Sequence, residues 1–240
     1  MTTSVIDIRR STDRFHTRAG WLDSKHSFSF GGHYSPDNTH HGQLLVLNDD
    51  RVAGGTGFDT HPHRDMEIVT WVLDGELEHR DSEGNEGVIY PGLAQRMSAG
   101  RGIRHSEKNH SATDEVHFIQ MWVVPDTQGI DPGYEQLDVN EHLAAGGLVP
   151  VVSGQGHEGA ISIRQQDAVL WVARLATGER VQVPDAPHAH VFIARGAAEL
   201  EAHGPLDTGD AVRLTEAGSM DLQAADGGAE ILIWTTGPMQ

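Results

Sequence analysis

Glycine and proline interrupt this sequence at short intervals, and that spacing constrains the fold more than any other feature. The 240 residues include 28 Gly and 10 Pro, and the runs between them are short and rich in Val, Ile, Leu and Trp. Turn-forming pairs such as Asp74-Gly75 and Pro91-Gly92 separate many of these runs. Short strands at regular spacing with such turns indicate an all-β sandwich or barrel. The runs expected to form strands include Gln43–Leu47, Glu67–Leu73, Val116–Val124, Leu170–Leu175, His190–Ala194 and Ile231–Trp234.

One helix is expected near the middle of the chain. Asp138 to Glu141 follow the pattern of a capping box, and Gly146-Gly147 would end the helix soon after it begins. The segment before it, from Pro125 to Tyr134, has few strand formers. We therefore expect an N-terminal β domain over residues 1–130, a connector with a short helix over 131–150, and a C-terminal β domain over 151–240. The common rhythm of strands and glycine turns suggests a duplicated barrel.

Charge and cysteine content exclude several classes of protein. The 17 Lys and Arg against 35 Asp and Glu give a net charge of −18, whereas nucleic-acid binding needs clustered basic residues to neutralise phosphates. The same charge argues against an anionic membrane surface, and no apolar run approaches the ~18 residues of a membrane span. The chain has no Cys, which excludes disulfides, Cys-ligated metals and thiol nucleophiles. The N-terminus lacks an apolar signal-peptide core, so the expected location is the cytoplasm.

Two pairs of residues have the spacing of metal ligands. His61 and His63 are two apart, so in an extended segment both imidazoles point to the same face. His105 and Glu107 have the same spacing after a glycine-rich loop. Two adjacent strands that each point two ligands inward would surround one ion. Imidazole nitrogen with a carboxylate suits divalent Fe, Ni, Cu, Mn or Zn, and open coordination positions would admit substrate or dioxygen.

Spacing alone leaves the carboxylate ligand open. Asp65 and Glu67 continue the parity of His61 and His63 if the strand is unbroken, so Glu67 competes with Glu107. Either could bind the metal while the other orients a ligand imidazole.

The remaining histidines and the tryptophans have simpler interpretations. His188 and His190 share a strand face, but no later His completes a second site, so we expect structural or surface roles. Asp81 to Glu86 are expected to form a solvated hairpin turn. We expect a solvated loop, or the rim of the site, for His33, His40 and His41; surface or hydrogen-bonding roles for His79, His110 and His117; and core positions for Trp71, Trp122, Trp171 and Trp234.

Longer patterns surround the two ligand pairs. The run from Gly55 to Glu67 resembles the first cupin motif, and the run from Gly87 to His105 resembles the second. Across residues 21–124 the sequence resembles the pirin family, especially its bacterial branch with quercetinase activity. The segments that carry this resemblance are His26–Gly31, Val46–Asp50, His61–Ile68, Asp74–Ser82 and Met97–Glu107.

The pirin resemblance implies a bicupin fold, with two small antiparallel β-barrels of jelly-roll type and metal in the N-terminal barrel only. Carried over residue by residue, the implied ligands are His61, His63, His105 and Glu107. Glu67 then lies inside the barrel or behind the ligands. The implied metal is Fe(II), with Ni, Cu, Mn or Zn as alternatives.

The resemblance also implies a function. It points to a dioxygenase that opens a ring of a flavonol-like aromatic substrate such as quercetin and releases carbon monoxide, with Glu107 taking the proton of the substrate hydroxyl. A second hypothesis is a metal-containing regulatory protein that acts through protein partners. A third is a cupin isomerase or a metal-dependent sugar-binding module. Turnover of quercetin with dioxygen uptake separates the first hypothesis from the others.

Overall fold

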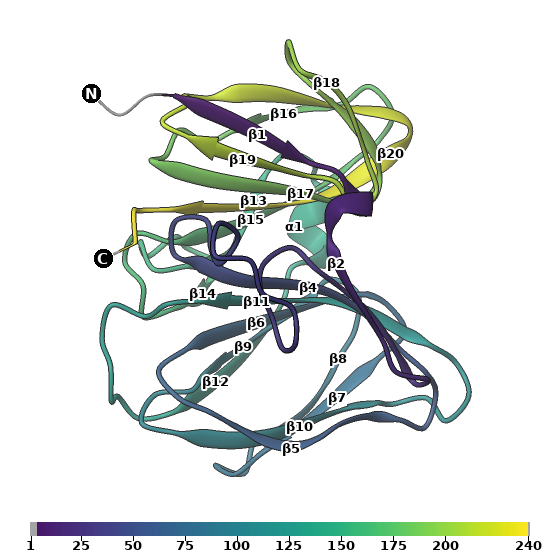
Figure 1. Ribbon diagram of the computed structural model, residues 1–240, viewed down its shortest axis with the longest axis vertical. Helices are drawn as coiled ribbons and strands as arrows, with labels where there is room; N and C mark the ends of the chain where they lie inside the picture. The colour runs from purple at the N-terminus through teal and green to yellow at the C-terminus, as the bar shows by residue number, and fades with distance from the viewer. Residues whose placement is uncertain (1–3, 240) are drawn as a thin grey trace.

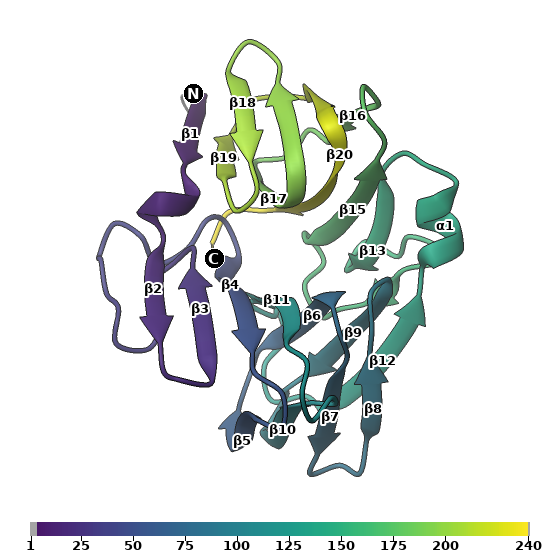
Figure 2. The ribbon, with the colours of Figure 1, turned by 90° about the vertical axis from the view of Figure 1, so that its right-hand side faces the viewer.

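The computed structural model describes residues 4–239, which fold into three antiparallel-rich β-sheets and one short helix, α1 (Figures 1 and 2). The C-terminal sheet has nine strands, the central sheet has seven and the distal sheet has four. In Figure 1 the C-terminal sheet occupies the upper part of the molecule, and the central and distal sheets form the lower part. The expectation of an all-β protein with a short connecting helix is confirmed.

Strand order places segments far apart in sequence side by side. The C-terminal sheet runs β1-β19-β17-β20-β15-β13-β14, with β16 beside β20 and β18 beside β17. Its strands are β1 (Val5–Arg9), β13 (Val149–Ser153), β14 (Ile161–Ser162), β15 (Val169–Leu175), β16 (Arg180–Val183), β17 (His188–Leu200), β18 (Gly204–Asp207), β19 (Ala211–Thr215) and β20 (Met220–Thr236).

The other two sheets are built from residues 15–138. The central sheet runs β12-β9-β6-β11-β4-β3-β2, and the distal sheet runs β5-β10-β7-β8. The central strands are β2 (Phe15–Arg18), β3 (Leu22–His26), β4 (Leu44–Val52), β6 (Glu67–Asp74), β9 (Leu93–Ser98), β11 (Val116–Val123) and β12 (Gly133–Asp138). The distal strands are β5 (Gly57–His63), β7 (Leu77–Asp81), β8 (Glu86–Ile89) and β10 (Ile103–Asn109).

Alternation along β11 shows how one strand serves both the core and the site. Ile119 and Met121 belong to the hydrophobic core shared by the central and C-terminal sheets. Gln120 and Trp122 alternate with them and line a cavity on the opposite face of the sheet. Successive side chains of a strand point to opposite faces, so a continuous apolar strand can carry a polar group into a site without breaking the core.

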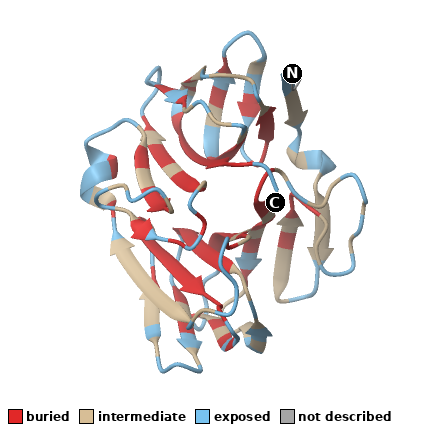
Figure 3. Ribbon diagram, turned by 90° about the vertical axis from the view of Figure 1, so that its left-hand side faces the viewer, coloured by how far each residue is buried: buried red, intermediate tan, exposed pale blue. Residues whose placement is uncertain are grey.

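The core between the central and C-terminal sheets is anchored by two buried tryptophans. Trp71 donates its indole N–H to Glu230 Oε1 at 2.7 Å, and Trp234 donates to the sulfur of Met121 at 3.1 Å. Both are fully buried, as expected, and Figure 3 shows buried residues concentrated on the facing strands. The core expectation is wrong for Trp122, which lines the cavity, and for Trp171, which is half-buried at the edge of a second core cluster.

The first and last strands of the N-terminal half depart from the expected pattern. β1 pairs with β19, so Val5–Arg9 extend the C-terminal sheet (Figure 2). β12 lies within the segment expected to be a connector, yet it pairs with β9 along its whole length and completes the central sheet. The division into domains at 1–130, 131–150 and 151–240 therefore stays a proposal. By strand pairing, β1 would belong to the C-terminal domain and β12 to the N-terminal domain.

The helix α1 (Asn140–Ala144) is a little over one turn long. Its start is fixed by Asp138, whose Oδ1 accepts the backbone N–H of Asn140 at 2.9 Å, and no side-chain capping bond reaches Glu141. Gly146 follows with a φ of 83°, a conformation that glycine adopts readily and that ends a helix. Within residues 4–239, no helix is long and apolar enough to cross a membrane.

Candidate metal centre

Three histidines from two neighbouring distal strands converge on one point. β5 and β10 are antiparallel partners, and their register sets His105 opposite His61. The ring centroids are 4.5 Å apart for His61 and His105, 4.8 Å for His61 and His63, and 4.9 Å for His63 and His105. One ligand nitrogen from each residue lies within 4.8 Å of the other two. The sequence spacing therefore brings together the three imidazoles that it predicted.

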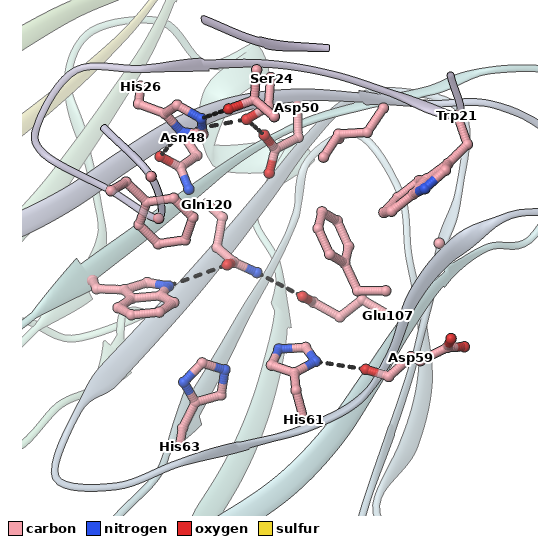
Figure 4. Close-up of a pocket in the computed structure, with 18 residues that line it drawn as sticks. Trp21, Ser24, His26, Asn48, Asp50, Asp59, His61, His63, Glu107 and Gln120 are labelled. Atoms are coloured by element: carbon pink, nitrogen blue, oxygen red, sulfur yellow. Dashed lines mark hydrogen bonds between the residues drawn. The ribbon is translucent and has the colours of Figure 1, made fainter. Parts of the chain in front are cut away.

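A hydrogen bond fixes which nitrogen of His61 is free. His61 Nδ1 lies 2.7 Å from the carbonyl oxygen of Asp59 (Figure 4). A carbonyl oxygen can only accept, so Nδ1 carries the proton and donates it. In the neutral imidazole, Nε2 then presents a lone pair.

Two residues behind His105 orient it in the same way. His79 Nε2 lies 3.2 Å from Asp81 Oδ2, and His79 Nδ1 lies 3.4 Å from His105 Nδ1. The carboxylate accepts from Nε2 of His79, so the Nδ1 atom of neutral His79 is an acceptor for the Nδ1–H of His105. His105 Nε2 then carries the lone pair. This Asp81–His79–His105 chain has the form of the hydrogen bonds that orient metal-ligating imidazoles.

The free nitrogens meet the requirements of a metal site. His63 Nε2 and His105 Nε2 are buried and have no hydrogen-bond partner in the described part of the chain. Burial and the nearby His105 and His61 imidazoles lower the pKa of His63 to about 4. Burial and the imidazoles of His61 and His79 lower the pKa of His105 to about 3. Both rings are neutral at pH 7, the form in which imidazole binds a metal, so this donor set fits a divalent ion.

Glu107 lies beside the histidines on β10 and is held by a glutamine. Both carboxylate oxygens accept from Gln120 Nε2, at 2.9 and 2.8 Å. Trp122 Nε1 donates to Gln120 Oε1 at 3.1 Å and so fixes the amide orientation. Glu107 forms a second candidate ligand group with His79 and His105, in which one ligand atom of each residue lies within 4.8 Å of the others, and it is not a member of the group of His61, His63 and His105. Glu107 is 2% exposed and lies two residues from His105 on the same strand, β10.

Glu67 is separated from the histidines because the strand breaks. β5 ends at His63 and β6 begins at Glu67 in a different sheet. Between them Asp65 has a φ of 46°, a left-handed conformation that interrupts an extended strand. Glu67 is buried and accepts from Ser98 Oγ at 2.8 Å. The expectation that Asp65 and Glu67 continue the parity of the histidines is wrong, and neither candidate ligand group in residues 4–239 contains Glu67.

A cavity of about 540 Å³ opens from the imidazoles between the central and distal sheets. That volume is typical of a small-molecule site. Aromatic side chains form much of its wall, and the end opposite the histidines is polar (Figure 4). The aromatic residues are Trp21, Phe30, Phe58 and Trp122, and the polar ones are Ser24, His26, Asn48 and Asp50.

The polar end of the cavity is a connected group of buried side chains. Ser24 Oγ donates to Asp50 Oδ1, and His26 Nδ1 lies 2.8 Å from Asn48 Oδ1. Burial raises the pKa of Asp50 to about 7. This end lies opposite the candidate ligands, so it offers hydrogen-bonding groups to the far side of a molecule bound in the cavity.

Other expectations around these sites have mixed outcomes. For His79, the hydrogen-bonding alternative is confirmed and the surface alternative is wrong, because the side chain is fully buried. Asp81 was expected in a solvated turn, yet its carboxylate is 0% exposed. His41 is only partly exposed and donates to the Leu214 carbonyl at 3.0 Å between the two halves, and it does not line the large cavity. The signal that could have found His79 and Asp81 is their i, i+2 spacing on a strand beside His105.

Two family models match the chain. One, described as Pirin, covers residues 8–123, and the other, described as Quercetinase C-terminal cupin domain, covers residues 150–234. A putative quercetin 2,3-dioxygenase of Mycobacterium tuberculosis is 55% identical over 97% of this chain and 95% of its own length. A quercetin 2,3-dioxygenase of Escherichia coli is 37% identical over 98% of this chain and 100% of its own.

A solved structure extends the comparison to three dimensions. The crystal structure of the bacterial pirin YhhW from Escherichia coli in complex with nickel(II) has a TM-score of 0.89 at 34% identity, covering 98% of this chain and 100% of that chain. Together with the two matching models, this likeness confirms the expected bicupin fold.

Proposed function

We propose that this chain, which belongs to the pirin family, is a metal-dependent dioxygenase of the quercetin 2,3-dioxygenase type. The substrate class is a flavonol-like aromatic with an enolic hydroxyl, and the reaction uses dioxygen to open the ring with release of carbon monoxide. Relatives at 37% and 55% identity that are named for this activity support the reaction class. Cytoplasmic location is part of the same proposal.

His61, His63 and His105, through their Nε2 atoms, and the carboxylate of Glu107 are the groups that would hold the metal. A divalent ion there would lower the pKa of a coordinated substrate hydroxyl. We propose Fe(II), with Ni, Cu, Mn and Zn as alternatives, and the related Escherichia coli pirin has been crystallised with nickel(II).

Glu107 is the group that would accept the hydroxyl proton. Its carboxylate is buried at the metal end of the cavity, and Gln120 donates to both oxygens. Because Trp122 holds Gln120 in one orientation, the carboxylate is kept in place and ready to accept. A positioned base of this kind contributes typically ~10²–10⁴-fold to a proton transfer.

The cavity walls would orient the rest of the substrate. Trp21, Phe30 and Phe58 offer apolar and aromatic surface to flat rings, and stacked or edge-to-face aromatic contacts add to their burial. At the polar end, Asn48 and protonated Asp50 can hydrogen-bond to hydroxyl groups on the far ring. Enclosure by these walls excludes water from the reacting end.

The observation that carries the proposal is the pair of unpartnered, buried Nε2 atoms of His63, which lines the aromatic cavity, and His105, whose ring packs against His63. The test is to purify the protein without oxygen, measure its metal content, and follow quercetin loss and carbon monoxide release. Activity should disappear on chelation and return with added Fe(II) or another divalent ion. A fully metallated protein that leaves quercetin unchanged would overturn the dioxygenase proposal and favour the regulatory hypothesis.

A further inference from the structure

A second, much smaller cavity lies between the two halves of the molecule. Its volume is about 20 Å³, enough for a single water-sized species. Arg14, Ser27 and Asn38 line it from the N-terminal half, and His190 and Arg213 line it from the C-terminal sheet. None of its lining residues lines the large cavity of the candidate metal centre, so it is a separate site.

Arg213 is a buried cation without an anionic partner. It is 6% exposed, and one of its terminal nitrogens donates to the Ser27 carbonyl at 2.8 Å and to Asn38 Oδ1 at 2.6 Å. Both acceptors are neutral. In residues 4–239, none of the ion pairs within 4.0 Å includes Arg213. Buried charges in proteins are normally paired, so the charge of Arg213 would stabilise an anion in this cavity.

The cavity is also surrounded by donors that have no acceptor. Arg213 Nε, Arg14 Nε and Ser27 Oγ are buried and lack a partner among the described residues. The ring nitrogens of His190, one a donor and one an acceptor in the neutral imidazole, also lack a partner there, and the residue is 1% exposed. Each unsatisfied buried polar group is costly. Several around one small cavity point to a bound species that accepts hydrogen bonds.

The neighbouring charges favour an anion over water. The Arg14 guanidinium is already paired with Asp49 at 2.7 Å. Asp7, which lies opposite Arg213 across the β1–β19 ladder, is paired with Arg9 at 2.7 Å, so Arg213 is left without an ion-pair partner. Water would satisfy some donors but would not neutralise Arg213, whereas a monatomic anion does both. Arg9 and Asp13 also line the cavity, and because both are exposed and of opposite charge, they leave the buried charge of Arg213 as the main electrostatic influence on an occupant.

We propose that this cavity binds one small monatomic anion of the halide class, with chloride as its ordinary occupant. The ion contacts donors from both halves of the chain, so it stabilises their association as well as the charge of Arg213. This proposal is independent of the metal centre and of the reaction proposed for it. Because the protein carries a net charge of −18, general attraction of anions is unfavourable, and binding must come from this local arrangement.

Bromide is the probe that tests the site, because it replaces chloride and can be located by anomalous scattering. The full-length protein is dialysed into sodium gluconate, and bromide is then added at constant ionic strength. We expect one anomalous peak between Arg213 and His190, and a rise of Tm by roughly 2–4 °C as bromide reaches 100 mM. No peak and no rise would mean that the cavity holds water, and the proposal would be wrong. A peak in soaked crystals without a rise in Tm would mean binding at crystal concentration only and would also overturn it.

Substitutions separate this site from a general salt effect. Arg213→Met should abolish the bromide-dependent rise in Tm, and Arg180→Met, at an exposed arginine of β16, should preserve it. If Arg213→Met does not fold, His190→Leu gives a second test, since it removes two of the unpartnered nitrogens at similar volume. An unchanged bromide response in the folded cavity variant would contradict the proposal.

Discussion

His79 and His105 are joined through their Nδ1 atoms at 3.4 Å, and Asp81 accepts from the other nitrogen of His79 at 3.2 Å. The buried Asp81 carboxylate does not contact His105, yet through His79 it determines which nitrogen of His105 is free. Tyr134 stacks on His79 with the ring centroids 4.7 Å apart and holds that ring flat against its neighbour. The orientation of a candidate metal ligand therefore depends on residues that would not touch the metal.

The first prediction follows from this chain. His79→Ala removes the acceptor that keeps the proton of His105 on Nδ1, so metal affinity should fall by ~10–100-fold, the usual cost of losing such an orienting partner. The affinity is measured by titration of the metal-free protein with Fe(II) or Ni(II). His110→Ala, at a half-exposed histidine near the end of the same sheet, is the control and should bind metal normally. Equal affinity in both variants would show that His79 does not position His105.

The candidate site was predictable where it depends on local spacing and was not where it depends on strand breaks. His61 with His63 and His105 with Glu107 each lie within one strand, so a period of two residues suffices to align them. The competing Glu67 could be excluded only with the structure, because the left-handed φ at Asp65 leaves no clear mark in a sequence that has no glycine there. Gln120, which holds Glu107, looks like an ordinary residue of an apolar strand.

The fold, like the site, was predictable from local patterns but not where it depends on contacts between distant segments. Frequent glycine turns and short apolar runs predicted an all-β chain, and each expected run overlaps a strand. The pairing of β1 with β19 was not predictable, since it joins residues about 200 positions apart through contacts that no local pattern records. β12 was missed because its residues, Gly133–Asp138, are half-buried at a sheet edge and carry few β-branched side chains.

The second prediction distinguishes the two halves. His105→Ala should abolish metal-dependent turnover and reduce the metal content, because it removes one of three converging imidazoles. His188→Ala should leave the metal content unchanged, since His188 and His190 belong to neither candidate ligand group in residues 4–239, although the His41 ring lies near both. Elemental analysis of both variants measures the metal bound per chain and tests this prediction. Two metals per chain in the parent protein, with one lost in His188→Ala, would contradict this assignment.

The third prediction concerns pH and Asp50. Burial raises its pKa to about 7, whereas the unfolded chain releases this proton near pH 4. Between these values the folded state binds more protons than the unfolded state, so this group makes stability fall as pH rises from about 4 to 7, with no further change above. Asp50→Asn cannot ionise and should remove that fall. Its free energy of unfolding should exceed that of the parent at pH 8 by roughly 1–3 kcal/mol.

Denaturant unfolding at pH 4.5 and pH 8 checks this expectation for Asp50. The difference between variant and parent should be larger at pH 8 than at pH 4.5. Asp37→Asn, at an exposed loop position, controls for the loss of one negative charge and should show a small difference at both values. A difference for Asp50→Asn that does not change with pH would mean that the buried carboxyl is already ionised at pH 4.5.

The last prediction compares the two buried glutamates at the centre of the molecule. Glu107→Gln keeps the size of the side chain but removes the negative charge, and it sets an amide N–H₂ against the donating amide of Gln120. If Glu107 both binds the metal and takes the substrate proton, turnover should stay low by ~10²–10⁴-fold even at saturating metal. Glu67→Gln keeps an acceptor for Ser98 Oγ and should cost less, although a residue behind the ligands can still cost ~10–100-fold. Both variants are assayed with quercetin at saturating metal, where differences in metal affinity are removed. A greater loss for Glu67→Gln under those conditions would mean that the two carboxylates have been assigned the wrong way round, and that the metal recruits Glu67 by a rearrangement of the break at Asp65.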